Sequence, residues 1–208
     1  MLAALPPVPW SSATAVLLDL ARRDLTAGSL PRPRLTAHAG GDGLGLAELR
    51  PHAADVVPPL LELLALFLPL GADRLTLAVV GRAWSLDDPV VPVCRTGDLR
   101  QRVLVVLRAD AHRGRCRLSG VLYPIESVPG ASAEGPWRLG AAVRTTDEPE
   151  GRTGAALQAL LDGRARLLGT RRPHQLATQY ARVLLLGHRV SVTDGRVEQL
   201  LADTVALP

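Results

Sequence analysis

The sequence predicts an α+β domain with a mainly antiparallel sheet of about five to six strands, helices packed on one face and a C-terminal helical pair. Several segments of alternating apolar residues follow one another without a helix between them. This favours antiparallel pairing, because parallel neighbours need a crossover connection. Segments with helical spacing of apolar residues lie before, between and after these strands. Hydrophobic residues make up 47% of the 208 residues, so the chain can bury a core without a disulfide or a metal.

We expect one domain over residues 1–208, with one place where it could be subdivided. Residues 145–154, TTDEPEGRTG, are polar and acidic, and the chain beyond them has a helical pattern. This junction would separate a sheet-containing core, residues 1–148, from a C-terminal helical segment, residues 149–208. The sequence leaves open whether the second part stands alone or completes the core.

The first expected elements are a helix and a hairpin. Ser11 or Ser12 can cap a helix that runs to about residue 27, and Gly28 is suited to end it. Apolar residues then alternate on both sides of a glycine-rich turn, which predicts a hairpin over residues 34–50. The glycines match no phosphate-binding motif, so we interpret them as turn residues.

The second helix is expected from Pro51 to about Leu68. Pro58 and Pro59 predict a kink or a division within it, because proline lacks the amide hydrogen that a helix interior uses. A strong strand follows over residues 74–80.

The longest alternating stretch, residues 102–123, predicts a hairpin at the centre of the sheet, with one face buried and the other in solvent. The solvent face would carry four Arg side chains, whose guanidinium groups suit carboxylate or phosphate. The alternative is that these are ordinary solvating charges. The expected binding residues are Arg102, Arg108, Arg115, Arg117, Trp84 and Tyr123.

Two long irregular loops, residues 82–98 and 124–136, are expected on either side of the central hairpin, and such loops often carry function. The remaining expected elements are a strand over residues 137–144, helices over 153–168 and 173–186, a short edge strand over 188–192 and a short helix over 197–201. The helix over 173–186 has a wide leucine-rich stripe, which either its own domain or another subunit would bury.

The catalytic candidates lie in the first irregular loop and in the central turn. Cys94 stands beside Arg95, and nearby positive charge favours the nucleophilic thiolate. His112 or His38 could supply a base, and Asp87 and Asp88 an acid/base pair. No family signature surrounds them, so the alternative is a packed cysteine and a turn formed by the two aspartates.

No metal or cofactor is expected, because the five His residues show no helical metal-ligand spacing and only two Cys are present. The cysteine usage fits a reduced cytoplasmic interior. The apolar run over residues 56–70 is interrupted by prolines and is shorter than the ~20 residues of a membrane span. The chain has no Lys or Asn and a single Ile, which indicates a bacterial genome rich in G and C.

Nucleic-acid binding is possible but not favoured. Arg residues gather over residues 100–117 and 164–172, yet the formal net charge is only +4, and only 3% of the residues are aromatic. A binder of single strands usually adds aromatic stacking platforms to its basic groove.

We therefore expect a cytoplasmic, non-enzymatic protein-interaction or accessory domain that binds a protein partner, a second copy of itself, or both. The Arg-bearing face and residues 82–98 would form its recognition surface. The alternative is a small-molecule-binding protein or an enzyme that uses loops 82–98 and 124–136. The third hypothesis is an accessory protein that binds RNA or DNA.

Overall fold

A computed structural model describes residues 8–51, 55–83, 100–112, 115–132, 135–144, 152–164 and 173–192. The helices of these residues are α1 (Ala13–Thr26), α2 (Val57–Phe67), α3 (Arg152–Asp162) and α4 (Pro173–Leu185), and a 3-10 turn, η1 (Trp10–Ser12), precedes α1. The strands are β1 (Arg34–Ala39), β2 (Asp42–Glu48), β3 (Arg74–Ala83), β4 (Gln101–His112), β5 (Arg115–Ser132), β6 (Gly135–Leu139), β7 (Val143–Arg144) and β8 (Arg189–Val192).

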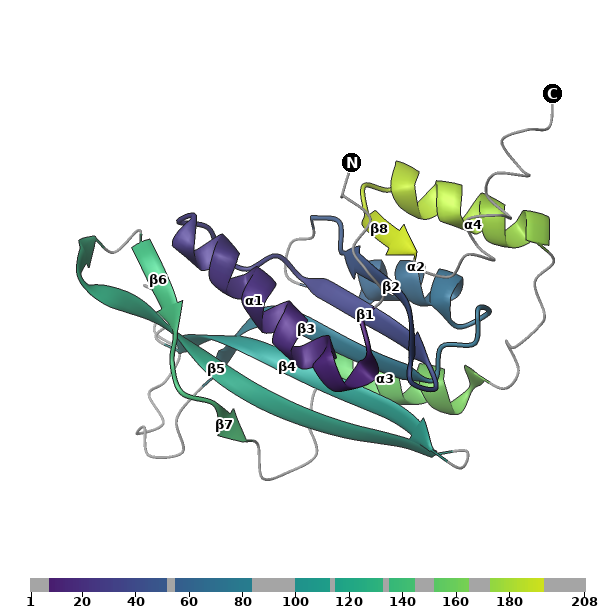
Figure 1. Cartoon of the computed structure of the whole chain (residues 1–208), viewed down its shortest axis with the longest axis horizontal. Coiled ribbons are helices and arrows are strands. Elements are labelled where there is room, and N and C mark those ends of the chain that lie inside the picture. Colours follow the sequence, from purple (N-terminus) through teal and green to yellow (C-terminus); the bar gives the residue numbers. More distant parts are fainter. Residues whose placement is uncertain are drawn as a thin grey trace.

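The strands form one sheet in the order β6-β5-β4-β3-β1-β2-β8, and β7 pairs with β5 beside this path (Figure 1). Every strand pair in the described residues is antiparallel, so the α+β class and the antiparallel sheet are confirmed. Seven strands lie along the path, where five to six were expected. The strand expected over residues 137–144 is divided into β6 and β7, of which only β6 lies on this path. Between them, the Gly140 N–H donates to the Pro124 carbonyl at 2.7 Å.

Both predicted hairpins are present. β1 pairs with β2 across a turn in which Gly40 takes a φ of 62°, a conformation that side-chain-bearing residues rarely adopt. β4 pairs with β5 over ten positions, from Val103 opposite Pro124 to His112 opposite Arg115. The turn residues 113–114 lie outside the described part of the chain.

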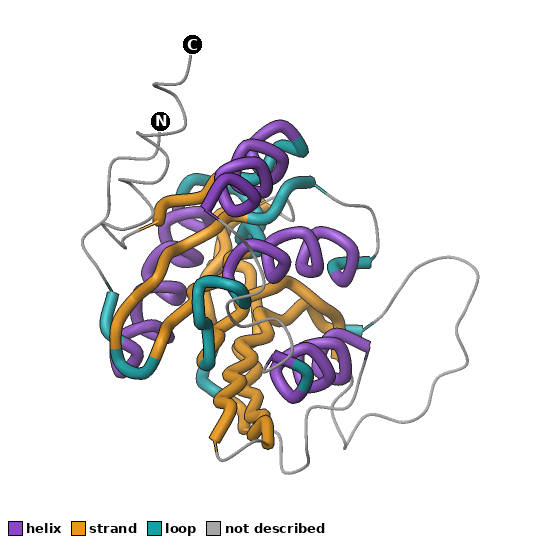
Figure 2. Tube along the Cα trace, turned by 90° about the vertical axis from the view of Figure 1, so that its right-hand side faces the viewer, coloured by secondary structure: helices purple, strands orange, loops and turns teal. Residues whose placement is uncertain are grey.

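The sheet has helices on both faces. In β4, Leu107 and Ala109 join the apolar cluster that includes α2, α3 and α4, whereas Leu104 and Val106 join the cluster that includes α1. Figure 2 shows helices on both sides of the strands. The expectation of helices on one face therefore holds only for α2, α3 and α4. Since both faces of β4 pack against helices, residues 103–107 are apolar at every position.

Two expectations about prolines are wrong. Pro58 and Pro59 do not kink a longer helix but stand at its first turn, where the amide hydrogens that proline lacks are not used by the helix. The described residues of the loop expected over 124–136 are not irregular, because residues 124–132 form the end of β5 and residues 135–136 the start of β6. Pro124 is tolerated within β5 because pairing changes there from β4 to β6.

The C-terminal elements extend the same sheet and core. β8 pairs with β2, and Leu157 of α3 and Val183 of α4 lie in the large apolar cluster with the leucines of α2. The short helix expected over residues 197–201 lies outside the described residues.

The close contact between β2, β8 and α2 gives a test of this arrangement. A Cβ atom added at Gly45 would lie 2.6 Å from the Ser191 carbonyl oxygen and 3.0 Å from Cε1 of Phe67. We expect Gly45→Ala to lower the free energy of unfolding by about 1–3 kcal/mol, the usual cost of overpacking. Urea denaturation followed by circular dichroism would measure this change.

Gly41→Ala is the matched control, because a Cβ atom there meets nothing within 4 Å. Equal stability of the Gly45→Ala and Gly41→Ala variants would contradict the placement of β8 against β2.

Candidate functional site

Polar side chains gather at one end of the sheet face that α1 covers, near the β1–β2 turn. In the strand register they form two rows across β1, β3, β4 and β5, which we call the polar rows. The first row is Thr36, Thr76, Arg108 and Ser119, and the second is His38, Arg74, Asp110 and Arg117. Neighbours on one face of an antiparallel pair have Cβ atoms about 4.5–5.5 Å apart, so each row is a continuous polar strip.

The position of α1 decides which part of this face is covered. Leu17 and Leu18 pack with Ala78, Leu104 and Val106, which lie on the strands directly beside the polar rows. The helix therefore buries the apolar part of the face, and its N-terminal end reaches the polar rows.

An ion-pair network holds the C-terminal end of α1 on the sheet. The buried guanidinium of Arg34 donates to Asp24 of α1 at 2.7 Å and to Glu48 of β2 at 3.3 Å. Arg32 also donates to Glu48 at 2.8 Å. With one end fixed in this way, the other end of α1 and the turn η1 are set over the polar rows.

Trp10 of η1 lies against three members of the polar rows. Its ring meets His38 edge-on at a centroid distance of 5.3 Å. The Arg108 guanidinium carbon lies 4.4 Å from the Trp10 ring centroid, and that of Arg74 lies 5.8 Å from it. Cation–π contacts of this kind are worth about 0.5–2 kcal/mol each, so they hold the segment before α1 against the sheet.

His38 is fully buried beneath this segment. Its Nε2 lies 2.8 Å from the Val8 carbonyl oxygen, which can only accept, so Nε2 carries the hydrogen. Burial lowers the pKa of His38, and the positive charges of Arg74 and Arg108 lower it further, against the raising effects of the Val8 carbonyl and Asp73. In the neutral ring Nδ1 is an acceptor, and it has no hydrogen-bond partner among the described residues.

Three threonine hydroxyls near His38 are also buried without a partner in the described residues. Thr36 and Thr76 are cross-strand neighbours in the first polar row, and Thr14 lies in the first turn of α1. Thr14 precedes Leu17 and Leu18 by three and four positions, which places it on the helix face toward the sheet. Each buried polar group without a partner costs about 1–3 kcal/mol, so such a cluster requires an explanation.

The polar rows carry an excess of positive charge. Arg74 donates to Asp110 at 3.3 Å, and Arg117 faces Asp110 from β5. Arg108 stacks on Trp10 and has no acidic partner among the described residues. A half-buried guanidinium in this situation is suited to bind an anionic group.

The binding residues expected from the sequence do not form one surface. Arg108 and Arg117 belong to the polar rows, whereas Arg102 lies toward the opposite end of β4, beside Arg82 of β3. Tyr123 pairs with Leu104 and packs in the apolar cluster of α1. The expectation of an open solvent face is therefore wrong for its centre, because α1 covers it. Arg115 pairs with His112 in the strand register, but the side chains of both lie outside the described part, and so does Trp84.

The candidate catalytic residues stay untested. Cys94, Asp87 and Asp88 lie outside the described residues, as does the side chain of His112. Of the loop expected over residues 82–98, only Arg82 and Ala83 are described, and they belong to β3. The other cysteine, Cys116, is buried, and burial together with Asp162 and Asp110 raises its pKa to about 11, which makes it a poor nucleophile.

A second cluster of titratable groups, around Glu62, has its polar groups paired with one another and serves to hold the fold together. Glu62 of α2 accepts from Arg50 at 2.7 and 2.9 Å and from His188 Nε2 at 2.7 Å. The Arg50 backbone N–H donates to Nδ1 of the same histidine at 3.1 Å. Both ring nitrogens of His188 are thus hydrogen-bonded within the protein. The cluster connects α2 to the segment that leads into β8.

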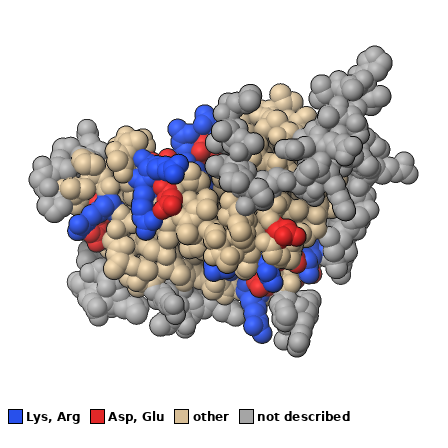
Figure 3. Space-filling model, viewed as in Figure 1, with Lys and Arg blue, Asp and Glu red and all other residues tan. Residues whose placement is uncertain are grey.

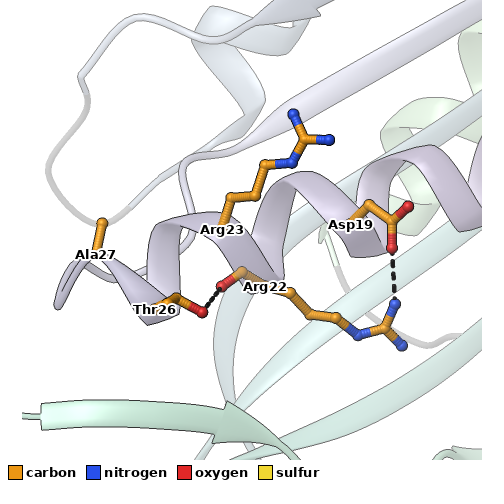
Figure 4. Close-up of a pocket in the computed structure, with 5 residues that line it drawn as sticks. All are labelled: Asp19, Arg22, Arg23, Thr26 and Ala27. Atoms are coloured by element: carbon orange, nitrogen blue, oxygen red, sulfur yellow. Dashed lines mark hydrogen bonds and ion pairs between the residues drawn. The ribbon is translucent and has the colours of Figure 1, made fainter.

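The described residues on the face drawn in Figure 3 show no comparable gathering of groups. Blue and red side chains lie next to one another in small groups on the face in Figure 3, which is not the pattern of one basic patch. A shallow hollow of about 460 Å³ lies on the outer side of α1, lined by Asp19, Arg22, Arg23, Thr26 and Ala27 (Figure 4). Asp19 and Arg22 pair with each other at 2.9 Å, so this is an ordinary charged helix surface.

Comparison of the chain with known protein families, with curated proteins and with solved structures finds no match. Within the described residues, no group of three or more His, Cys, Asp or Glu side chains could hold a metal ion. In the same residues, no helix is long and apolar enough to cross a membrane.

The sequence did not single out Trp10, Thr36 or Thr76 as site residues, and it suggested His38 only as a base for Cys94. The available signal was that Thr36 and His38 alternate with apolar residues in β1, and that Thr76 interrupts the apolar run of β3. Alternation predicts that such residues share a face, but it equally fits a face in contact with water. Only the packing of α1 and Trp10 shows that they are buried together.

The Glu62 cluster predicts how stability depends on pH. The hydrogen bond from Arg50, with a smaller contribution from His188, lowers the pKa of Glu62 from 4.5 to about 2. Burial lowers the pKa of His188. Both groups therefore bind protons more readily in the unfolded chain, so stability falls as the pH drops below neutrality and falls further between pH 5 and 2. We expect Glu62→Gln to lower the free energy of unfolding at pH 7 by roughly 2 kcal/mol and to flatten its pH dependence below pH 5.

Urea denaturation at several pH values would measure both effects. Asp19→Asn is the control, because the Asp19–Arg22 pair is more than half exposed and should change stability by less than about 1 kcal/mol. A Glu62→Gln protein with the wild-type pH profile would contradict this account of the cluster.

Proposed function

We propose that the chain is a non-catalytic protein-interaction domain that associates with a second copy of itself. The observation that carries this proposal is a run of three leucines at the end of α4. Leu184 is 42% exposed, Leu185 is 89% exposed and Leu186 is 39% exposed. We call these residues the leucine patch.

The leucine patch is not needed for the packing of α4 on its own domain. Among the described side chains of α4, Ala177 and Val183 are buried and Tyr180 packs against the core, and Val183 lies in the large core cluster. A single exposed leucine is common on protein surfaces, but adjacent large apolar side chains are typical of contact sites.

The edge of the sheet lies beside α4. The Tyr180 hydroxyl donates to the Val190 carbonyl of β8 at 3.5 Å, which places the helix along the strand. Within the described residues β8 pairs only with β2, and it stands at the end of the strand order. An edge strand offers backbone groups to an added strand.

A second copy of the chain fits this combination of features. An antiparallel pair of β8 strands has two-fold symmetry, so the same edge and the same leucine patch would be used on both copies. The sheet would continue across the interface, and the two leucine patches would gain partners together.

The proposal predicts that Leu185→Asp weakens self-association. Burying one leucine contributes about 1.5–3 kcal/mol, and a two-fold interface contains the residue twice, so we expect at least a tenfold increase in the dissociation constant. Analytical ultracentrifugation over roughly a hundredfold range of protein concentration would measure it.

Val143→Asp is the matched control, because Val143 is also an exposed apolar residue, at 53%, and lies in β7, far from α4 (Figure 1). It should leave the dissociation constant unchanged. A wild-type protein that stays monomeric over the whole concentration range would refute the proposal.

A further inference from the structure

We propose that the polar rows beneath Trp10 bind a small oxyanion, a phosphate or carboxylate group, and that the segment Val8–Ser12 is the cover of this site. The inference does not depend on self-association, because the leucine patch and β8 belong to other elements of the fold.

The first argument comes from buried polar atoms. The hydroxyls of Thr36 and Thr76 are buried without a partner among the described residues, on facing positions of β1 and β3. Folded proteins rarely keep several such groups together unless a bound molecule satisfies them. Apolar residues of the same shape, such as valine, would make this part of the sheet more stable than threonine does. The threonines therefore indicate a bound ligand.

The second argument comes from charge. Arg108 lies next to Thr76 in the first polar row and has no acidic partner among the described residues. Arg74 pairs with Asp110, the one carboxylate of the polar rows, and Arg117 stands opposite Asp110 in the strand register. Two hydroxyls beside a guanidinium provide the donors that an oxyanion needs, and the excess positive charge provides the attraction.

The third argument comes from the cover. Trp10 lies against His38 and Arg108, and its backbone N–H donates to Gly41 at 3.3 Å. The Val8 carbonyl accepts from His38, and a Cβ atom on Gly43 would lie 2.8 Å from that carbonyl oxygen. The ring contacts and hydrogen bonds just named hold the cover, whereas Asp24 and Arg34 fix α1 separately, so the cover can lift while α1 stays in place.

Isothermal titration calorimetry tests the site with two probes, inorganic phosphate and acetate, at an ionic strength kept constant with sodium chloride. We expect at least one probe to bind the wild-type protein with a stoichiometry of one. Thr76→Val should weaken that binding by about tenfold or more, the effect of one hydrogen bond to a charged group. The probe that binds identifies the oxyanion as phosphate or carboxylate.

The control is Thr26→Val, which changes an exposed threonine near the other end of α1 and should leave binding unchanged. Urea unfolding without probe gives a second readout. If the threonine serves a ligand, Thr76→Val should raise the unfolding midpoint, because it removes a buried hydroxyl that lacks a partner.

Gly43→Ala tests the cover. The added methyl group would displace Val8, so the open form should be more populated and the apparent affinity should rise. An unchanged or weaker affinity in this folded variant would overturn the role of Val8–Ser12 as a cover.

Two outcomes would overturn the site itself. If neither probe binds and Thr76→Val lowers the unfolding midpoint, the threonines hold a structural water instead. If neither probe binds and Thr76→Val raises the unfolding midpoint, the buried polar atoms bind no ligand.

Discussion

The pairing of β3 with β4 is the constraint on which the rest of the structure depends, because both strands pack against helices on both faces. Leu75, Leu77 and Leu107 face α2 and α3, while Ala78, Leu104 and Val106 face α1. Two apolar layers are therefore built on one strand pair. As a consequence, a polar residue on either face of these strands is buried. In a sheet covered on one face only, a polar residue on the other face would be exposed to water.

The polar rows follow directly from this two-sided burial. α1 covers the apolar part of its face, and Trp10 covers the part where Thr36, Thr76 and His38 stand. The arrangement is held at both ends, by Arg34 with Asp24 at one end and by the stacking of Arg108 on Trp10 at the other. The leucine patch lies on a different element, on the side of the sheet where α2 and α4 pack. A self-association surface and a ligand site can therefore coexist, since neither uses the residues of the other.

Much of the fold could be predicted because its signals are local. The hairpins β1–β2 and β4–β5 join neighbouring segments, so alternation and turn residues were sufficient to place them. Pro58 and Pro59 were misread because a proline pair fits either a kink or a first helical turn, and only the observed start of α2 at Val57 decides between them. Residues 124–136 were misread because proline and glycine usually mark loops, whereas here Pro124 stands where β5 exchanges one partner strand for another.

The sequence by itself determined the elements, their order and which residues alternate along each strand, because these depend on spacing and on contacts between near neighbours. It also determined that Arg108 and Arg117 share a face, once the central hairpin was recognised. Only the tertiary structure decided that α1 lies on that face and that Trp10 meets His38 and Arg108. The reason is physical: alternation reports that two residues share a side, but whether that side meets water or a helix depends on packing between segments far apart in the chain.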